Sequence, residues 1–223
     1  GVAYTLAENS KGDVLAEVVL YENVIKNSFE YNEDVKESIF WNLLPSCEVE
    51  PSLGIKFGKP AKMNRCVGFF ADPEKIKGYR YSGQISRSQH PPDFLSDLLS
   101  DVNHVTEEYR SATEFNASLV NVYRDGSDYI SQHSDDEKAL ADGVVVALSL
   151  GATRTFRIQR TKQTGKDVSF FNLEKDTLDI ELPGGSLLIM RGPLFHQLFT
   201  HGLPKRLRVK EPRLSITFRY HSS

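Results

Sequence analysis

Short apolar runs, each about the length of a β-strand, dominate the second half of the chain. Aliphatic and aromatic residues there either alternate with polar ones or form continuous stretches, the patterns of half-buried and fully buried strands. Turn-forming residues separate the runs, among them Asp125-Gly126, Gly151, Gly165 and Pro183-Gly184-Gly185. The pattern predicts about seven strands, at 117–123, 144–150, 153–159, 168–173, 177–182, 186–190 and 213–220.

The first half contains two helical patterns. Residues 14–25 predict a strand or a short buried element, and Asn32 can cap a helix that runs to Leu44, just before Pro45. A second helix is predicted after Pro91-Pro92, where apolar residues recur at helical spacing: Phe94, Leu95, Leu98, Leu99 and Val102. Helices followed by many short strands predict an α+β, mainly β fold, with the helices packed on one face of a closed or double-sheet structure.

The segment between the helices, residues 54–83, mixes short extended pieces with basic and aromatic side chains. Basic residues bind phosphates and aromatic rings stack on bases, so the mixture suits nucleic acid. A sheet edge with a packed aromatic cluster would have the same composition, and the segment alone does not decide between them. The residues are Lys56, Lys59, Lys62, Arg65, Lys75, Lys77 and Arg80, with Phe57, Phe69, Phe70, Tyr79 and Tyr81.

Composition indicates an ordinary globular protein. The chain has 223 residues, of which 39% are hydrophobic and 26% charged, and this predicts one domain without repeats or linkers. No apolar run is long enough for a membrane span, and no signal peptide is visible. Cys47 and Cys66 match no zinc pattern and are interpreted as reduced thiols, with a single disulfide between them as the alternative. We therefore expect a monomer inside the cell, in the cytoplasm or nucleus, with no membrane partner.

The net charge of −3 is unevenly distributed. Residues 1–50 contain 3 Lys/Arg and 10 Asp/Glu, a net charge of −7, whereas residues 153–223 contain 13 and 6, a net charge of +7. The basic half could bind a polyanion, although an unevenly charged solvated surface would give the same counts.

The candidate chemistry centres on His133-Ser134-Asp135. Side chains two residues apart on an extended backbone point to the same face, so this His and carboxylate could bind one metal ion. A second His from another strand would complete the two-histidine, one-carboxylate set of non-haem Fe(II) oxygenases, which leaves coordination positions open. The candidates for it are His196 and His201, while His90, His104 and His221 have no partner motif and are interpreted as ordinary polar or surface residues.

Two arginines near the C-terminus could bind an anionic cosubstrate. Arg213, Ser215, Thr217 and Arg219 share one face of the last predicted strand, so both guanidinium groups can point into the β structure. A buried arginine needs an anion, and a dicarboxylate would supply one through bidentate pairing.

Several motifs in the expected order resemble the AlkB family of Fe(II)- and 2-oxoglutarate-dependent dioxygenases. They are NVYRDGSDYISQHSDDE (121–137), PGGSLLIM (183–190), THGLP (200–204) and PRLSITFRY (212–220). The resemblance implies a double-stranded β-helix, or jelly roll, with flanking N-terminal helices. It also implies that His133, Asp135 and His201 are the catalytic metal ligands, because the family's second metal His precedes a small residue and Leu or Ile. By the same resemblance the cosubstrate-binding residues are Asn121, Tyr123, Arg213 and Arg219.

The segments KFGK (56–59) and YRYSG (79–83) resemble the nucleotide-recognition lid of the AlkB branch that repairs nucleobases. The match covers roughly residues 54–220, and the expected organisation is one domain over 1–223, with an N-terminal extension at 1–53, this recognition lid at 54–90 and a catalytic core at 115–220. A base can be oxidised only after it leaves the stack, so an aromatic residue that fills the vacancy is physically reasonable. The implied substrate-binding residues are Phe57, Tyr79, Tyr81, Asp136 and Glu137.

The implied function is oxidative demethylation of N-alkylated bases in DNA or RNA, with Fe(II), 2-oxoglutarate and O2, releasing formaldehyde, succinate and CO2. The alternative is hydroxylation of a peptide or small metabolite on the same core, since one fold serves many substrates. A non-catalytic nucleic-acid-binding domain is the second alternative, although such a domain would have little reason to keep every ligand.

Overall fold

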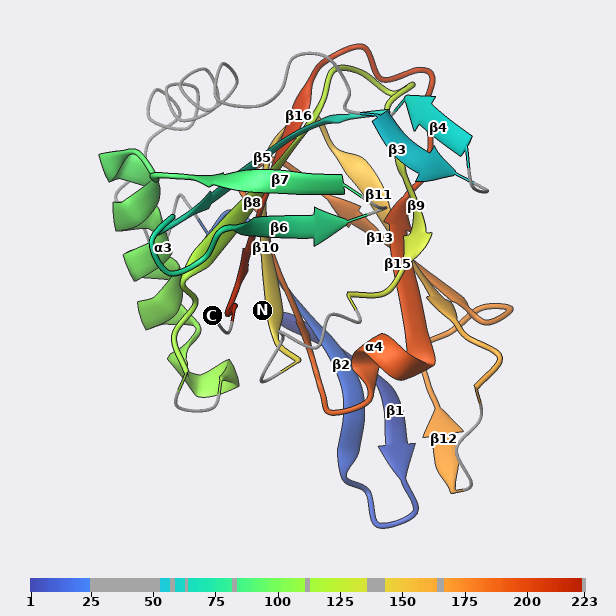
Figure 1. Cartoon of the computed structure of the whole chain (residues 1–223). Coiled ribbons are helices and arrows are strands. Elements are labelled where there is room, and N and C mark those ends of the chain that lie inside the picture. Colours follow the sequence, from blue (N-terminus) through green and yellow to red (C-terminus); the bar gives the residue numbers. More distant parts are fainter. Residues whose placement is uncertain are drawn as a thin grey trace.

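The structure is a computed structural model that describes residues 1–24, 53–56, 59–62, 64–81, 84–110, 113–135, 143–163 and 167–221 (Figure 1). For residues 53–56, 59–62, 80, 81, 84 and 85 only the backbone is described. The helix predicted from Asn32 to Leu44 lies outside these residues. No helix in the described ranges is long and apolar enough to cross a membrane.

Most described strands belong to two sheets. In spatial order the large sheet contains β12 (Val168–Phe170), β1 (Val2–Asn9), β2 (Val14–Tyr21), β14 (Leu187–Arg191), β10 (Val145–Gly151), β16 (Arg213–Arg219), β8 (Ala117–Tyr123), β5 (Cys66–Ala71), β7 (Gln84–Gln89) and β6 (Gly78–Tyr81). The small sheet contains β13 (Thr177–Leu182), β11 (Arg154–Arg160), β15 (Phe199–Leu203) and β9 (Ile130–His133). A separate hairpin is formed by β3 (Leu53–Lys56) and β4 (Lys59–Lys62).

Alternation along the strands builds two apolar layers. Val145 and Ala147 of β10 pack in the cluster that contains Phe156 and Ile158 of β11, so this cluster lies between the two sheets. The next residues of β10, such as Val146, belong to a second cluster with helical residues. Two facing sheets of mainly antiparallel strands form the predicted jelly roll, and the mainly β fold class is confirmed.

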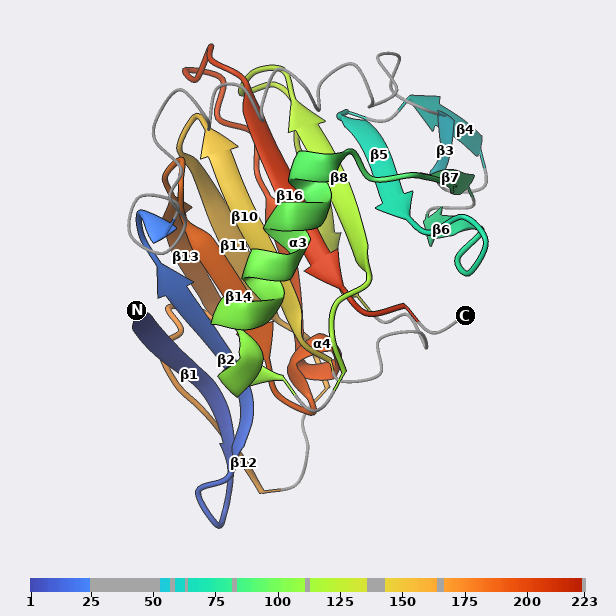
Figure 2. The same cartoon turned by 90° about the vertical axis from the view of Figure 1, so that its left-hand side faces the viewer.

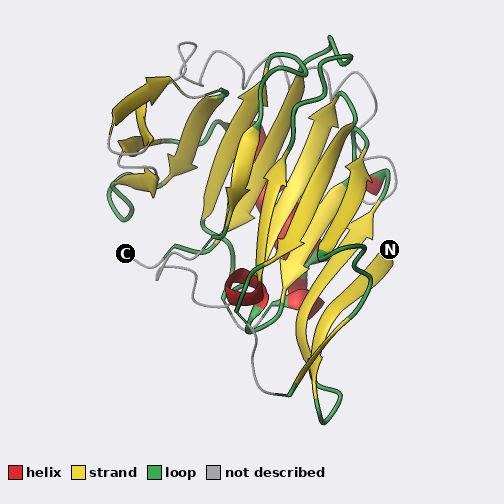
Figure 3. Ribbon diagram, turned by 90° about the vertical axis from the view of Figure 1, so that its right-hand side faces the viewer, coloured by secondary structure: helices red, strands yellow, loops and turns green. Residues whose placement is uncertain are grey.

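Helix α3 (Asp93–Val105) covers the outer face of the large sheet (Figure 2). It begins after Pro92, a residue whose fixed φ suits the start of a helix, and buries Leu95, Leu98 and Val102. This confirms the helix predicted after Pro91-Pro92. On the opposite side of the molecule strands face the viewer (Figure 3). Two short elements complete the described helices, η2 (Glu107–Tyr109) and α4 (Phe195–Leu198).

The predicted strands are all present with shifts of a few residues at their ends. The strands at 117–123 and 177–182 have the predicted bounds, while β12 ends three residues early, at Phe170. Asn172 has a φ of 56°, a left-handed conformation that a continuing strand could not contain. Strand β1 was not predicted. Its pairing with β2 and β12 stabilises it, and that information is not local.

The large sheet takes strands from each part of the predicted domain. Strands β1 and β2 come from residues 1–53, β5 to β7 from 54–90, and the remaining strands from the predicted core. The part of the predicted recognition lid that includes β5 is therefore integrated in the main sheet through β8. The division into three parts stays a prediction.

Candidate metal centre

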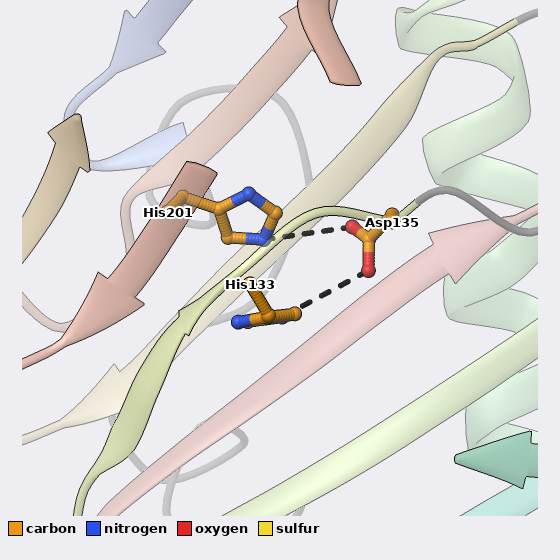
Figure 4. Close-up of side chains that lie close together, drawn as sticks. All are labelled: His133, Asp135 and His201. Atoms are coloured by element: carbon orange, nitrogen blue, oxygen red, sulfur yellow. Dashed lines mark ion pairs between the residues drawn. The ribbon is translucent and has the colours of Figure 1, made fainter. Parts of the chain in front are cut away.

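The register of two neighbouring strands of the small sheet brings two histidines together. His133 is the last residue of β9 and lies directly opposite His201 of β15. Their ring centroids are 4.4 Å apart. Asp135 follows just past the end of β9, and its carboxylate points toward both rings (Figure 4). One ligand atom from each of the three side chains lies within 4.8 Å of the others, close enough to hold one metal ion.

Both imidazoles are neutral at pH 7. Burial lowers the pKa of His201 to about 3, and burial likewise lowers the pKa of His133. The Nε2 atoms lie 3.9 Å (His133) and 3.5 Å (His201) from the oxygens of Asp135. With uncharged rings these contacts are not ion pairs, and the nitrogen lone pairs are available to a cation.

The surroundings fix how the two rings are oriented. His133 Nδ1 lies 2.9 Å from the backbone oxygen of Ser131, to which it donates, so the lone pair is on Nε2 facing Asp135. The ring of His201 stacks on Phe156 at a centroid distance of 5.3 Å. A backbone oxygen that accepts from the ring N–H of a metal-binding histidine typically fixes the orientation of its ring. The stacked ring of Phe156 restricts the orientation of His201 in the same way.

Asp135 is buried and ionised. Burial by itself would raise the pKa of its carboxyl, but Arg219, and then His201 and His133, hold that pKa well below its ordinary value. A guanidinium nitrogen of Arg219 lies 3.6 Å from the carboxylate. The same guanidinium group donates to the hydroxyl of Tyr79 at 3.3 Å. The metal centre thus has one fixed negative charge and two neutral nitrogen donors, the donor set expected of a facial triad.

The rival histidine, His196, lies beside this group and not in it. It belongs to α4, its ring centroid is 6.4 Å from that of His201, and its Nε2 lies 3.2 Å from the backbone oxygen of Gly143. The geometry therefore favours His201 over His196 as the second histidine.

The predicted cosubstrate residues line the inner faces of β8 and β16. Arg213 pairs with Tyr123 across the two strands, and Ser215 pairs with Asn121. Arg213 is 2% exposed and donates to the backbone oxygen of Leu182 at 3.1 Å. It also donates to Ser149 Oγ at 2.6 Å and to the backbone oxygen of Ala152 at 3.4 Å.

Arg213 carries a buried charge without a counterion. Burial lowers its pKa to about 10, so it remains protonated at pH 7. Among the described residues no carboxylate lies within ion-pair distance, and the Nε atom has no acceptor. A buried cation in this state calls for an anion from outside the chain, and a carboxylate of 2-oxoglutarate has the matching shape.

Sequence reasoning missed two buried arginines of this region. Arg65 was interpreted as one of several basic residues of the recognition lid, but it is buried and its Nε donates to Asn121 Oδ1 at 2.7 Å. Arg154 belongs to no recognisable motif, yet its guanidinium lies 5.9 Å from the ring of Tyr123. Burial raises the pKa of Tyr123, which is therefore a neutral phenol. No motif distinguishes these arginines from the exposed ones near them.

The structure places only part of the predicted substrate-binding set. Tyr79 is buried, and its ring stacks on Phe69 at 5.6 Å, so it supports the metal centre through Arg219. The backbone of Tyr81 lies in β6, next to this buried tyrosine, but its side chain is not described. Phe57, Asp136 and Glu137 lie outside the described residues. Their role in substrate binding stays a prediction.

His221, interpreted from the sequence as an ordinary polar or surface residue, is not at the surface. It is buried, and its ring contacts Phe69 and Tyr79 edge-on at 5.4 and 5.7 Å. Burial lowers its pKa to about 4. It belongs to the packing behind Tyr79 and not to the metal centre, while His90 and His104 are exposed as expected.

Comparison with known proteins gives a consistent result. Residues 18–219 match the profile of the 2OG-Fe(II) oxygenase superfamily. The chain is 36% identical over 190 residues to the alpha-ketoglutarate-dependent dioxygenase alkB homolog 3 of Homo sapiens, a match that covers 83% of this chain and 62% of the relative. It is 40% identical over 142 residues to the DNA oxidative demethylase ALKBH2 of Homo sapiens, covering 63% of this chain and 51% of the relative.

The matches leave part of the relatives uncovered. The match to the alkB homolog 3 of Mus musculus, 40% identical over 114 residues, covers 51% of this chain and 38% of the relative. The chain thus spans less than two thirds of each of these relatives. A solved structure described as that of OsALKBH1 superposes with a TM-score of 0.58 at 18% identity, covering 91% of this chain and 97% of that one. At this identity the superposition supports the jelly-roll fold alone.

Proposed function

Because the chain belongs to the 2OG-Fe(II) oxygenase superfamily, and within it to the AlkB family, we propose that it is an oxidative demethylase of N-alkylated nucleobases in DNA or RNA. It would use Fe(II), 2-oxoglutarate and O2 and release formaldehyde, succinate and CO2. One observation carries the proposal: three ligand atoms within 4.8 Å of one another lie in the same inter-sheet space as Arg213, a buried cation without a counterion.

The residues of the metal centre fit Fe(II). His133 and His201 would each offer Nε2, and Asp135 one carboxylate oxygen, all in the protonation state that ligation requires. Arg219 keeps the carboxylate ionised from behind. Three protein ligands leave positions for a cosubstrate and O2.

The residues around Arg213 fit 2-oxoglutarate. The guanidinium would bind its distal carboxylate, and Tyr123, directly across the strand pair, would donate its hydroxyl proton as a hydrogen bond. Asn121, held through its Oδ1 by Arg65, would present its amide group on the path from Arg213 to the metal. These side chains orient the cosubstrate and exclude water, because each is buried between the sheets.

When bound, Fe(II) and 2-oxoglutarate supply the oxidation, in which O2 is consumed, 2-oxoglutarate becomes succinate and CO2, and one oxygen atom enters a C–H bond of the N-methyl group. The N-hydroxymethyl group that results then breaks its C–N bond. Formaldehyde leaves, and the proton of the hydroxyl ends on the base nitrogen. The chain itself contributes position, charge and a dry site.

The name of one relative supports a nucleic-acid substrate: a human protein that resembles this chain is called DNA oxidative demethylase ALKBH2. The human alkB homolog 3 is named an alpha-ketoglutarate-dependent dioxygenase, which supports the oxidative chemistry. We extend the proposal to a monomer that acts in the cytoplasm or nucleus, where nucleic acid and 2-oxoglutarate occur together.

A panel of oligonucleotides, each with one N-methylated base, tests the proposal. Single- and double-stranded DNA and RNA are incubated with the protein, Fe(II) and 2-oxoglutarate, and formaldehyde and the restored base are quantified. We expect formaldehyde and restored base in equal amounts, and none without 2-oxoglutarate. If 2-oxoglutarate is converted to succinate but no oligonucleotide is demethylated, the substrate is wrong, and a peptide or metabolite hydroxylase replaces it.

Two aromatic residues of the recognition lid separate substrate binding from chemistry. If Phe57 fills the vacancy left by a flipped base, Phe57→Ala should reduce activity mainly on double strands. If Tyr81 stacks on the flipped base, Tyr81→Ala should reduce activity on single and double strands alike, because stacking contributes roughly 1–3 kcal/mol in either context. Neither change should alter turnover of 2-oxoglutarate without a substrate. Demethylation at wild-type rates by both variants would contradict the lid assignment.

A further inference from the structure

Arg154 is a fully buried arginine at the first position of β11, with 1% of its surface exposed. Its guanidinium group donates to three backbone carbonyl oxygens, those of Asp125 at 3.2 Å, Asp128 at 2.9 Å and Pro204 at 2.8 Å. A planar group with five donors in a fixed fork is suited to hold several separated acceptors at once, whereas the three donors of a lysine all lie on one nitrogen.

The three acceptors belong to two different loops. Asp125 and Asp128 lie in the turn between β8 and β9, and Pro204 follows directly after β15. These strands carry Tyr123, His133 and His201. One guanidinium group therefore holds together the chain segments next to all three of these side chains.

Backbone contacts between the same loops support this arrangement. The amide of Gly126 donates to the oxygen of Val209 at 2.9 Å, and the amide of Arg206 donates to the oxygen of Gly126 at 2.8 Å. A Cβ atom on Gly126 would lie 1.7 Å from the oxygen of Arg206, so only glycine allows the loops to approach this closely. We call residues 124–129 and 204–209, with Arg154, the loop clamp.

The charge of Arg154 is not used in an ion pair within the described residues. The carboxylate of Asp128, whose backbone oxygen accepts from Arg154, is engaged by Arg124 at 2.7 Å. Arg154 instead faces the ring of Tyr123, whose strand partner is Arg213. The three carbonyl oxygens solvate this charge without neutralising it, so the positive charge remains available to an anion bound next to Tyr123.

We propose that Arg154 is a positioning residue for the cosubstrate: through the loop clamp it sets Tyr123 opposite Arg213 and adds a second positive charge beside the carboxylate that Arg213 binds. The inference rests on the proposed function, because it assumes that 2-oxoglutarate occupies this site. It also implies reciprocity, so that the bound cosubstrate should stabilise the clamp as the clamp stabilises its binding.

The effect of Arg154 on cosubstrate binding is tested by calorimetric titration of 2-oxoglutarate into the Mn(II)-loaded protein, in which the cosubstrate binds without turnover. Arg154→Met, which keeps the stem and removes charge and donors, should raise the Kd about tenfold, equivalent to about 1.4 kcal/mol. Arg154→Lys keeps the positive charge but loses the planar fork, so its Kd for 2-oxoglutarate should lie between those of Arg154→Met and the wild type. Arg157→Met is the matched control, because Arg157 lies three residues away on the same strand, partly exposed and paired with Asp179.

Limited trypsin digestion tests the clamp without any catalytic readout. Cleavage after Lys205, Arg206 or Arg208 requires the loop to open, so its rate follows the open population. We expect faster cleavage in Arg154→Met and Arg154→Lys, an unchanged rate in Arg157→Met, and slower cleavage of the wild-type protein when 2-oxoglutarate is added. The last measurement needs no variant and is decisive even if Arg154→Met does not fold.

The outcomes separate the two proposals. A wild-type protein that binds no 2-oxoglutarate contradicts the proposed function and this inference together. Wild-type binding with an unchanged Kd in the folded Arg154 variants overturns the inference alone, and leaves Arg154 a residue of fold stability. Wild-type binding without any protection of the loop from trypsin contradicts the coupling between clamp and cosubstrate.

Discussion

Replacing Arg213 by methionine should separate the stability of the empty protein from its response to 2-oxoglutarate. Arg213→Met keeps an apolar stem of similar length in a fully buried position. It removes the donors to Leu182, Ser149 and Ala152, which weakens the fold, but it also removes a buried charge without a counterion, which favours it. These effects oppose each other, so the unfolding free energy of the empty protein should change by at most about 2 kcal/mol.

The response to the cosubstrate should change much more. Truncating one partner of a buried, hydrogen-bonded charge pair costs about 2–5 kcal/mol, or roughly 30-fold to several thousand-fold in Kd. At a concentration 100 times the wild-type Kd, 2-oxoglutarate stabilises the wild type by about 2.7 kcal/mol. A 30-fold weaker variant keeps only about 0.9 kcal/mol of this at the same concentration. For a domain of this size the shift in Tm falls from about 5–11 °C to about 2–4 °C.

Thermal unfolding of the Mn(II)-loaded protein over a series of 2-oxoglutarate concentrations measures both quantities. Arg157→Met again serves as control, because Arg157 lies on the same sheet layer as the site but is partly exposed and paired with Asp179. Arg213→Lys should lie between wild type and Arg213→Met, since it keeps charge without the bidentate fork. Equal 2-oxoglutarate stabilisation of Arg213→Met and the wild type would refute the reasoning and move the carboxylate to a different cation.

Three further predictions concern single residues. Asp135→Ala should abolish both metal-dependent stabilisation and 2-oxoglutarate turnover while the protein stays folded, and wild-type decarboxylation in this variant would remove Asp135 from the metal centre. His221→Phe should flatten the acid side of the stability curve. The pKa of His221 is about 4 in the folded protein and near 6.5 in the unfolded chain. The contribution of the neutral ring to the unfolding free energy is therefore complete above pH 6.5 and is lost as the pH falls toward 4. Between pH 7 and pH 4.5 the unfolding free energy, measured with urea, should fall by about 2 kcal/mol less in the variant than in the wild type. An equal fall in both proteins would contradict the lowered pKa of His221. Gly126→Ala should lower the unfolding free energy by about 1–3 kcal/mol, because its Cβ would overlap the Arg206 oxygen, and an unchanged urea midpoint would mean that the loops separate freely.

Local patterns were sufficient for most of the helices and strands, though not for β1 or β15, and they were not sufficient for the pairing of the strands. The strand at 117–123 and the helix after Pro91-Pro92 depend on alternation, helical spacing and proline, all of which are visible in a short window. The pairing of β9 with β15, which sets His133 opposite His201, joins residues 68 positions apart in the chain. The resemblance to a family supplied that contact before the structure did, and no periodicity could have.

The same distinction explains which site residues were found. His133 and Asp135 are two residues apart, and Arg213 lies on a strand with a regular inner face, so short-range patterns revealed them. Arg154 and Arg65 act through backbone carbonyls and an amide contributed by distant segments. A carbonyl oxygen has no sequence signature, because every residue has one. Arginines that serve such acceptors can be recognised only when the fold is known.

The buried arginines also change what the charge asymmetry means. Of the 13 basic residues in 153–223, Arg154, Arg213 and Arg219 are buried, so at most ten can face a polymer, whereas all six acidic residues of the segment are exposed. The surface of this half is therefore much less basic than the count of +7 indicates. These three charges lie inside, where the dielectric constant is low and each charge acts strongly on a bound anion, and of the three only Arg219 is paired with a described carboxylate, that of Asp135. The sequence count that first suggested affinity for a polyanion thus includes buried arginines that we propose bind or position a small dicarboxylate. The steep salt dependence expected of phosphate contacts should therefore arise from the exposed lysines and arginines alone.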